Sequence, residues 1–85
     1  MRVTLEFFGP IQDRIGAAEL PMSLPAAPSS LESLVALLAA EREGAEHLLD
    51  DKLRVAVNDS VLMPGKPLSL KYGDRIAFLS PFSGG

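Results

Sequence analysis

Polar and apolar residues alternate along three segments of the chain, residues 2–7, 53–57 and 75–79. A period of two is typical of a β-strand with one face buried, so each segment predicts a strand. Residues 18–24 predict a weaker strand. Pro21 places that strand at an edge of the sheet, because proline has no N–H to donate to a neighbour. The expected inward positions of the three clear strands are Val3, Leu5, Phe7, Leu53, Val55, Val57, Ile76 and Phe78.

One segment has helical spacing instead. Its apolar stripe consists of Leu31, Leu34, Val35 and Leu38. Ser29 or Ser30 is expected to cap the start of this helix, and Ser29 followed by Glu32 has the spacing of a capping box. Gly44 suits the helix end. Residues 11–15 and 45–49 are each expected to form a shorter turn.

This order of elements predicts one domain of α+β class, residues 1–80, followed by a flexible tail, residues 81–85. The helix is expected to pack across one face of a mixed sheet of four or five strands. We expect the first strand to be central, beside the last strand and parallel to it. The chain of 85 residues is too short for a second domain.

Composition narrows the function classes. Apolar residues make up 47 % of the chain and charged residues 22 %, with a formal net charge of −3 and the two signs interspersed. That balance argues against nucleic acid or an anionic membrane surface as a partner. The longest apolar run, residues 34–40, is far shorter than the roughly 20 residues that span a bilayer. A cytoplasmic location is expected.

The chain contains no cysteine and a single histidine, His47. The lack of cysteine excludes a disulfide framework, a thiolate metal site and a cysteine nucleophile. A lone histidine without other ligands does not indicate a metal site, and no glycine-rich phosphate loop follows a strand. We therefore expect no bound cofactor, no bound metal and no active site within the chain itself.

Two features remain as candidates for function. The outward face of the predicted sheet carries Phe8, Ala56, Ala77 and Leu79, and Phe82 lies just beyond it. Such an apolar patch favours a protein–protein surface, although scattered exposed apolar residues also occur without a function. The second feature is the pair Gly84-Gly85, which lacks Cβ atoms and can enter a narrow channel. The alternative for this pair is a frayed chain end.

Three segments carry a resemblance to a known family: residues 3–9 (VTLEFFG), residues 55–58 (VAVN) and residues 73–85 (GDRIAFLSPFSGG). Together they resemble the small subunit of molybdopterin synthase, a ubiquitin-like sulfur carrier with the β-grasp fold. The similarity covers nearly the whole chain. Its most specific part is the Gly-Asp pair, the apolar run behind it and the terminal Ser-Gly-Gly. Many relatives have two prolines before the tail, where this chain has Ser80-Pro81.

The resemblance implies that the carboxylate of Gly85 is adenylated by an E1-like enzyme with ATP and converted to a thiocarboxylate, with Gly84 giving access. The thiocarboxylate would then donate sulfur to cyclic pyranopterin monophosphate in the large synthase subunit, within an expected heterotetramer. The residues expected to bind these partners are Phe8, Ala56, Ala77, Leu79, Pro81, Phe82 and Ser83.

Two other functions share the fold and the diglycine. One is sulfur transfer for thiamin thiazole or cysteine synthesis. The other is a ubiquitin-like protein modifier that is joined to lysines through Gly85.

Overall fold

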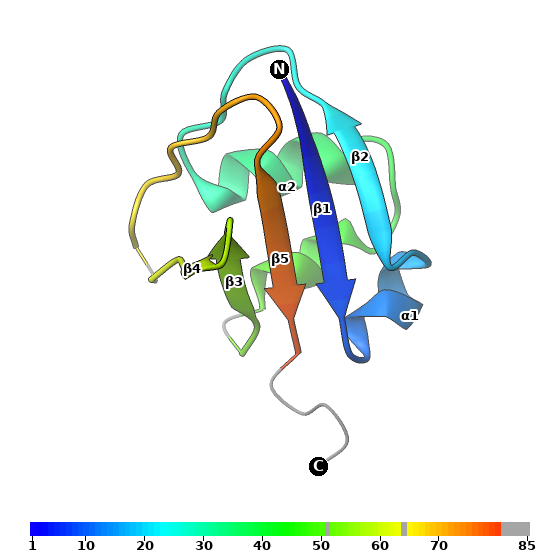
Figure 1. Cartoon of the computed structure of the whole chain (residues 1–85). Helices are drawn as coiled ribbons and strands as arrows, with labels where there is room; N and C mark the ends of the chain where they lie inside the picture. The colour runs from blue at the N-terminus through cyan, green and yellow to red at the C-terminus, as the bar shows by residue number, and fades with distance from the viewer. Residues whose placement is uncertain (51, 64, 81–85) are drawn as a thin grey trace.

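Five strands form one mixed sheet in the order β2-β1-β5-β3-β4, and the helices lie on one side of it (Figure 1). The computed structural model describes residues 1–50, 52–63 and 65–80. The strands are β1 (Arg2–Phe8), β2 (Glu19–Ser23), β3 (Arg54–Val57), β4 (Ser60–Val61) and β5 (Arg75–Leu79). The helices are α1 (Ile11–Ile15), α2 (Leu31–Ala39) and the 3-10 helix η1 (Ala45–Leu49). This is the predicted β-grasp arrangement, and the class prediction is confirmed.

Strand β1 is an interior strand of the sheet, and it pairs in parallel with β5, the middle strand, as expected. Leu5 lies opposite Ile76 and Phe7 opposite Phe78. Strand β2 is an edge strand that pairs with β1 alone, which accommodates Pro21. Because β1 and β5 run in the same direction, both end at the same edge of the sheet, and Phe8 and Leu79 are neighbours there. The end of β5, close to the last described residue, therefore lies at this edge.

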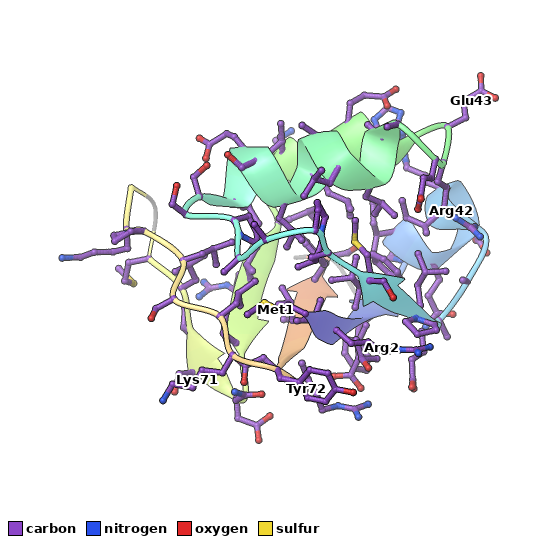
Figure 2. The ribbon with its side chains drawn as sticks, turned by 90° about the horizontal axis from the view of Figure 1, so that it is seen from above. Met1, Arg2, Arg42, Glu43, Lys71 and Tyr72 are labelled. Atoms are coloured by element: carbon purple, nitrogen blue, oxygen red, sulfur yellow. The ribbon has the colours of Figure 1, made fainter. Side chains whose placement is uncertain are left out.

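The core lies between the sheet and α2, which crosses one face of the sheet in the view of Figure 2. The inward residues of β1 and β5 are fully or almost fully buried, as the alternation predicted. Phe7 and Phe78 stack with their ring centroids 5.7 Å apart and their planes inclined by 17°. Leu34, Val35 and Leu38 of α2 belong to the same buried cluster. Aromatic pairs of this kind contribute about 0.5–1.5 kcal/mol to stability beyond the burial of their surface.

Helix α2 begins after Ser30, the second of the two predicted caps, but it ends earlier than predicted. Its N-cap is Ser30, whose Oγ accepts a hydrogen bond of 3.1 Å from the N–H of Ser33, so the capping box of Ser29 and Glu32 is wrong. The helix ends at Ala39, well before Gly44. Residues 41–44 contain no apolar side chain that another turn could bury. Gly44, with φ +89°, instead precedes η1.

The Gly-Asp pair before β5 has a structural role. Asp74 accepts hydrogen bonds from the Asn58 side chain (Nδ2–Oδ1, 2.8 Å) and from the N–H of Lys71 (2.7 Å). Asn58 in turn accepts the N–H of Arg75 at 2.9 Å. The two donors, Asn58 first, stabilise the ionised carboxylate and hold the pKa of Asp74 below its usual value. The network fastens the turn between β3 and β4 to the start of β5.

The described part of the segment between β4 and β5 contains no helix or strand. Leu68 and Leu70 of this segment are nevertheless buried in the core. Strand β4 has only two residues, and it closes the sheet beside β3. The strands are thus longer in the middle of the sheet, at β1 and β5, than at the β4 edge.

Candidate functional site

The outward face of the sheet brings together the four predicted residues of the described chain. Phe8 and Leu79 are opposite each other on β1 and β5, and Ala77 lies opposite Ala56 on β3. All four alternate with the buried inward residues, so their side chains lie on the side away from α2. Phe8 is 45 % exposed, and the other three residues are half-buried. Their role in binding a partner stays a prediction.

The other predicted site residues, Pro81, Phe82, Ser83, Gly84 and Gly85, lie outside the described residues. The division into a domain of residues 1–80 and a tail of residues 81–85 depends on the same segment and stays a prediction.

A shallow hollow of about 400 Å³ lies on this outward face. Phe8, Ala56 and Ala77 line it, and so do Glu6, Arg75 and the turn residues 58 and 59. Sequence reasoning missed the charged part of this lining. The alternation of polar and apolar residues does place Glu6 and Arg75 on the outward face of their strands. Combining them into one site, however, requires the register between β1 and β5.

Charged side chains border the apolar half of the face. Arg75 donates to Glu6 (Nη2–Oε2, 2.6 Å), and Glu19 of the edge strand lies 3.7 Å from the same nitrogen. Glu6 is the main reason that the pKa of Arg75 lies above its already high usual value. Exposed ion pairs of this kind add little stability, typically about 0–1 kcal/mol. We therefore regard the pair as a fixed charge pattern beside the apolar patch.

Val61 extends the apolar half toward the β4 edge. It pairs with Ala56 and is 60 % exposed. An apolar strip thus crosses the outward face, and we call it the sheet patch. It consists of Phe8, Ala56, Val61, Ala77 and Leu79. The strip begins at the edge where β1 and β5 end. A partner docked on the sheet patch would therefore also be close to residue 80.

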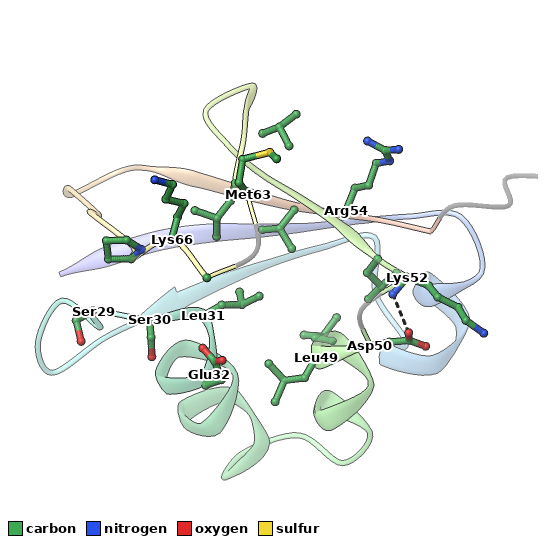
Figure 3. Close-up of a pocket in the computed structure, with 17 residues that line it drawn as sticks. Ser29, Ser30, Leu31, Glu32, Leu49, Asp50, Lys52, Arg54, Met63 and Lys66 are labelled. Carbon is green, nitrogen blue, oxygen red and sulfur yellow. Dashed lines mark hydrogen bonds between the residues drawn. The ribbon is translucent and has the colours of Figure 1, made fainter.

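A second and larger groove, of about 790 Å³, lies elsewhere, between the start of α2, the end of η1 and the β3–β4 side of the sheet (Figure 3). Leu31, Leu49 and Met63 contribute apolar surface to it, and Lys52 and Lys66 contribute positive charge. Of the sheet patch residues, Val61 also lines this groove, whereas the other four do not. We place the candidate site on the outward face, because that face is continuous with the end of β5.

His47 lies on η1 and is exposed, with its Nδ1 3.4 Å from Nη1 of Arg14. Within residues 1–50, 52–63 and 65–80, no three His, Asp or Glu side chains come together in a group that could hold a metal ion. In the same part of the chain, no helix is long and apolar enough to cross a bilayer. The described residues present an outward sheet face that is apolar in part and bordered by the charged side chains of Glu6 and Arg75.

Comparison with known proteins places this geometry in a family. A model of the ThiS family matches residues 5–85. The structure also matches a chain in the complex of subunits 1 and 2 of molybdopterin-converting factor from Helicobacter pylori. The two are 31 % identical, each chain is covered over 100 % of its length, and the TM-score is 0.63. A search of curated protein sequences gives no match.

More distant structures agree in fold. SAMP1 from Haloferax volcanii matches with a TM-score of 0.76 at 17 % identity, and 100 % of each chain is covered. A putative molybdopterin converting factor, subunit 1, from Pyrococcus furiosus matches with a TM-score of 0.71 at 19 % identity. That match covers 95 % of this chain and 98 % of the other. At these identities the similarity demonstrates the shared β-grasp fold.

Proposed function

Because the chain belongs to the ThiS family, whose fold is that of ubiquitin-like sulfur carriers, we propose that it carries sulfur as a thiocarboxylate on Gly85. The observation that carries the proposal is the extent of the family match, which runs through residue 85 and so includes Gly84-Gly85. The sheet patch next to the end of β5 supports it. The domain then serves to bind partners, and the chemistry takes place at Gly85.

The proposed chemistry needs an external activating enzyme. The carboxylate oxygen of Gly85 attacks the α-phosphorus of ATP, and pyrophosphate leaves. A sulfur nucleophile at the oxidation level of sulfide then displaces AMP from the acyl adenylate and leaves a thiocarboxylate. A carboxylate is a poor electrophile until it carries a leaving group such as AMP. The resulting sulfur is nucleophilic, and the chain has no cysteine with which it could exchange.

We further propose that the sulfur is used in molybdenum cofactor biosynthesis, where it passes to cyclic pyranopterin monophosphate in a large catalytic subunit. The support is the 31 % identity to a chain of the Helicobacter pylori complex, whose two components are subunits 1 and 2 of molybdopterin-converting factor. In this proposal the sheet patch docks on the large subunit. The five residues 81–85 span at most about 17 Å when extended, enough to place Gly85 inside a partner. An E1-like adenylating enzyme would use the same face.

Intact-mass spectrometry tests the proposal. After incubation with the E1-like enzyme, ATP and a sulfide donor, we expect the mass change of one oxygen replaced by one sulfur, located at Gly85 by fragmentation. A variant lacking Gly84 and Gly85 should show no change while keeping the melting temperature of the intact chain. Sulfur at any other residue, or no sulfur on the intact chain, would contradict the proposal.

The pathway needs a separate experiment, because other sulfur carriers share the diglycine. The thiocarboxylated chain is offered either the large synthase subunit with cyclic pyranopterin monophosphate or a thiazole synthase with its substrates. We expect loss of the sulfur only with the large subunit. Loss only with thiazole synthase would assign the chain to thiamin synthesis. A Gly-Gly remnant on lysines of other proteins would instead indicate a protein modifier.

A further inference from the structure

Ser80 joins the end of β5 to the start of α1. Its N–H donates to the carbonyl of Phe8 at 3.2 Å, which extends the pairing of β5 with β1 by one bond. Its Oγ accepts a hydrogen bond of 3.2 Å from the N–H of Ile11, the first residue of α1. The two contacts hold the backbone and the side chain of one residue on the same loop, residues 8–11. Ser80 is thus fixed from two directions immediately before residues 81–85.

The side-chain contact meets a local need of α1. The first N–H groups of a helix have no partner within the helix and are usually met by an N-cap side chain. Here the N-cap is Pro10, which supplies no side-chain hydrogen bond. The hydroxyl of Ser80, which lies 69 residues away along the chain, provides the acceptor instead. The short helix and the end of β5 are therefore linked through one hydroxyl group.

Gly9 makes room for this contact. Its φ is +81°, a conformation that residues with a side chain rarely adopt. A Cβ on residue 9 would lie 3.0 Å from the Cβ of Ser80 and 3.4 Å from its Oγ. A side chain at position 9 would therefore push Ser80 away from Ile11. We call Gly9, Ile11 and Ser80 the tail clamp.

We infer that Ser80 is a positioning residue for sulfur transfer, because the tail clamp fixes the point from which residues 81–85 continue. The inference rests on the proposed function of Gly85. Phe8 and Leu79 of the sheet patch directly precede Gly9 and Ser80 in the chain. A partner docked on the patch therefore meets the tail at a set origin. A short tethered segment reaches its target more often when its origin is fixed, because fewer of its conformations miss the target.

This role differs from a purely stabilising one. A neutral hydrogen bond contributes modestly to folding, and its loss would lower the melting temperature without selectively changing a step in the partner complex. A positioning role changes the rate of transfer from the docked carrier. It leaves the docking affinity alone, because the sheet patch is unchanged. The two roles are separated by comparing the transfer rate at saturation with the partner concentration that gives half of that rate.

The experiment compares Ser80→Ala, Ser80→Thr and the control Ser69→Ala, which removes the hydroxyl of an exposed serine outside the clamp. Each chain is first thiocarboxylated to the same extent, as measured by intact mass, and sulfur transfer to the large subunit is then followed in single turnovers. Amide hydrogen exchange of Ile11 reports the clamp directly.

We expect Ser80→Ala to lose protection at Ile11 and to transfer sulfur about two- to tenfold more slowly at saturation, the range that one hydrogen bond provides. The half-saturating concentration should stay within twofold. Ser80→Thr should restore the rate, and Ser69→Ala should match the wild type.

Each contrary result has a distinct meaning. If Ser80→Ala loses protection at Ile11 but transfers sulfur at the wild-type rate, the clamp exists and does not position the tail, which overturns the inference. Unchanged protection at Ile11 would overturn it as well. A higher half-saturating concentration at an unchanged saturated rate would show that Ser80 acts in docking, which also overturns the inference. If the wild-type chain accepts no sulfur at Gly85, the proposed function itself fails, and this inference fails with it.

Discussion

Phe7 and Phe8 are adjacent in the chain and lie on opposite faces of β1, so replacing each one separates stability from binding. Phe7 is completely buried and stacks on Phe78, whereas Phe8 is 45 % exposed on the sheet patch. We expect Phe7→Ala to destabilise the domain strongly and Phe8→Ala to weaken partner binding. The two variants remove the same chemical group from neighbouring positions, which makes each a control for the other.

The size of each effect follows from burial. Truncation of a fully buried phenylalanine costs about 3–5 kcal/mol. The same truncation at the half-exposed Phe8 loses about 1 kcal/mol, since only part of the ring leaves an apolar environment. A chain of this length has an unfolding entropy of roughly 0.18 kcal/mol/K, so about 1 kcal/mol lowers the melting temperature by roughly 5–6 °C. Phe7→Ala should therefore lower it by roughly 17–28 °C and Phe8→Ala by roughly 5 °C.

Partner binding should be weakened more by Phe8→Ala than by Phe7→Ala, as long as the Phe7→Ala variant is folded. If the exposed part of Phe8 is buried against the large subunit, its loss should cost about 1–2 kcal/mol of binding energy, a five- to thirtyfold rise in Kd. Thermal unfolding followed by circular dichroism measures the loss of melting temperature, and isothermal titration calorimetry measures the rise in Kd. Phe7→Leu, which keeps most of the buried volume, serves as a second core variant if Phe7→Ala is too unstable to titrate.

Two results would refute this reasoning. Equal losses of melting temperature for Phe7→Ala and Phe8→Ala would show that the outward face is packed as tightly as the core. An unchanged Kd for Phe8→Ala, with the domain folded, would show that the sheet patch does not contact the large subunit.

Three further substitutions test other parts of the structure. Ser30→Ala removes the N-cap of α2 and should cost about 0.5–2 kcal/mol in urea denaturation, whereas Ser29→Ala should change little. Leu79→Asp places a charge in the sheet patch and should raise the Kd for both the large subunit and the E1-like enzyme at least about tenfold while the domain stays folded. Asp74→Asn should lower the stability of the domain at neutral pH and make that stability fall less steeply as the pH is lowered. The urea midpoints of both chains, measured from pH 7 down to pH 2, would show this.

The sign of the pH effect follows from the direction of the pKa shift. The side chain of Asn58 and the N–H of Lys71 donate to ionised Asp74, so its pKa is lower in the folded chain than in the unfolded chain. The stabilisation is complete above the unfolded value of about 3.9 and is lost as the pH falls through the lower folded value. The curves of the wild type and Asp74→Asn should therefore converge in acid. Parallel curves would show that the carboxylate makes no charge-dependent contribution.

The remaining two predictions have their own contrary outcomes. Ser30→Ala with the stability of the wild type would mean that water satisfies the N–H of Ser33 equally well. A Leu79→Asp variant that binds both partners normally would remove the outward face from the proposal.

The strands were predictable because a period of two reports burial directly, whatever the neighbours of a strand are. Val3, Leu5 and Phe7 had to lie on one face, and Phe8 had to lie on the other. The helix was predictable from its apolar stripe, but its limits were not. Whether Ser29 or Ser30 caps α2 depends on the phase at which the helix meets the sheet, and local spacing does not contain that phase. Gly44 was equally compatible with ending one helix or preceding the next.

The candidate site was likewise predictable only in part from the sequence. The sequence by itself determined that the sheet has apolar residues on its outward face and that residues 84 and 85 are both glycine, because residue type and alternation are local properties. Only the tertiary structure decided that Glu6 and Arg75 border this face and that Ser80 contacts Ile11. Both contacts join residues 69 positions apart, and they exist because β1 and β5 lie side by side in parallel. That pairing is set by burial of the two strands against α2, and it brings residues 8–11 next to the end of β5.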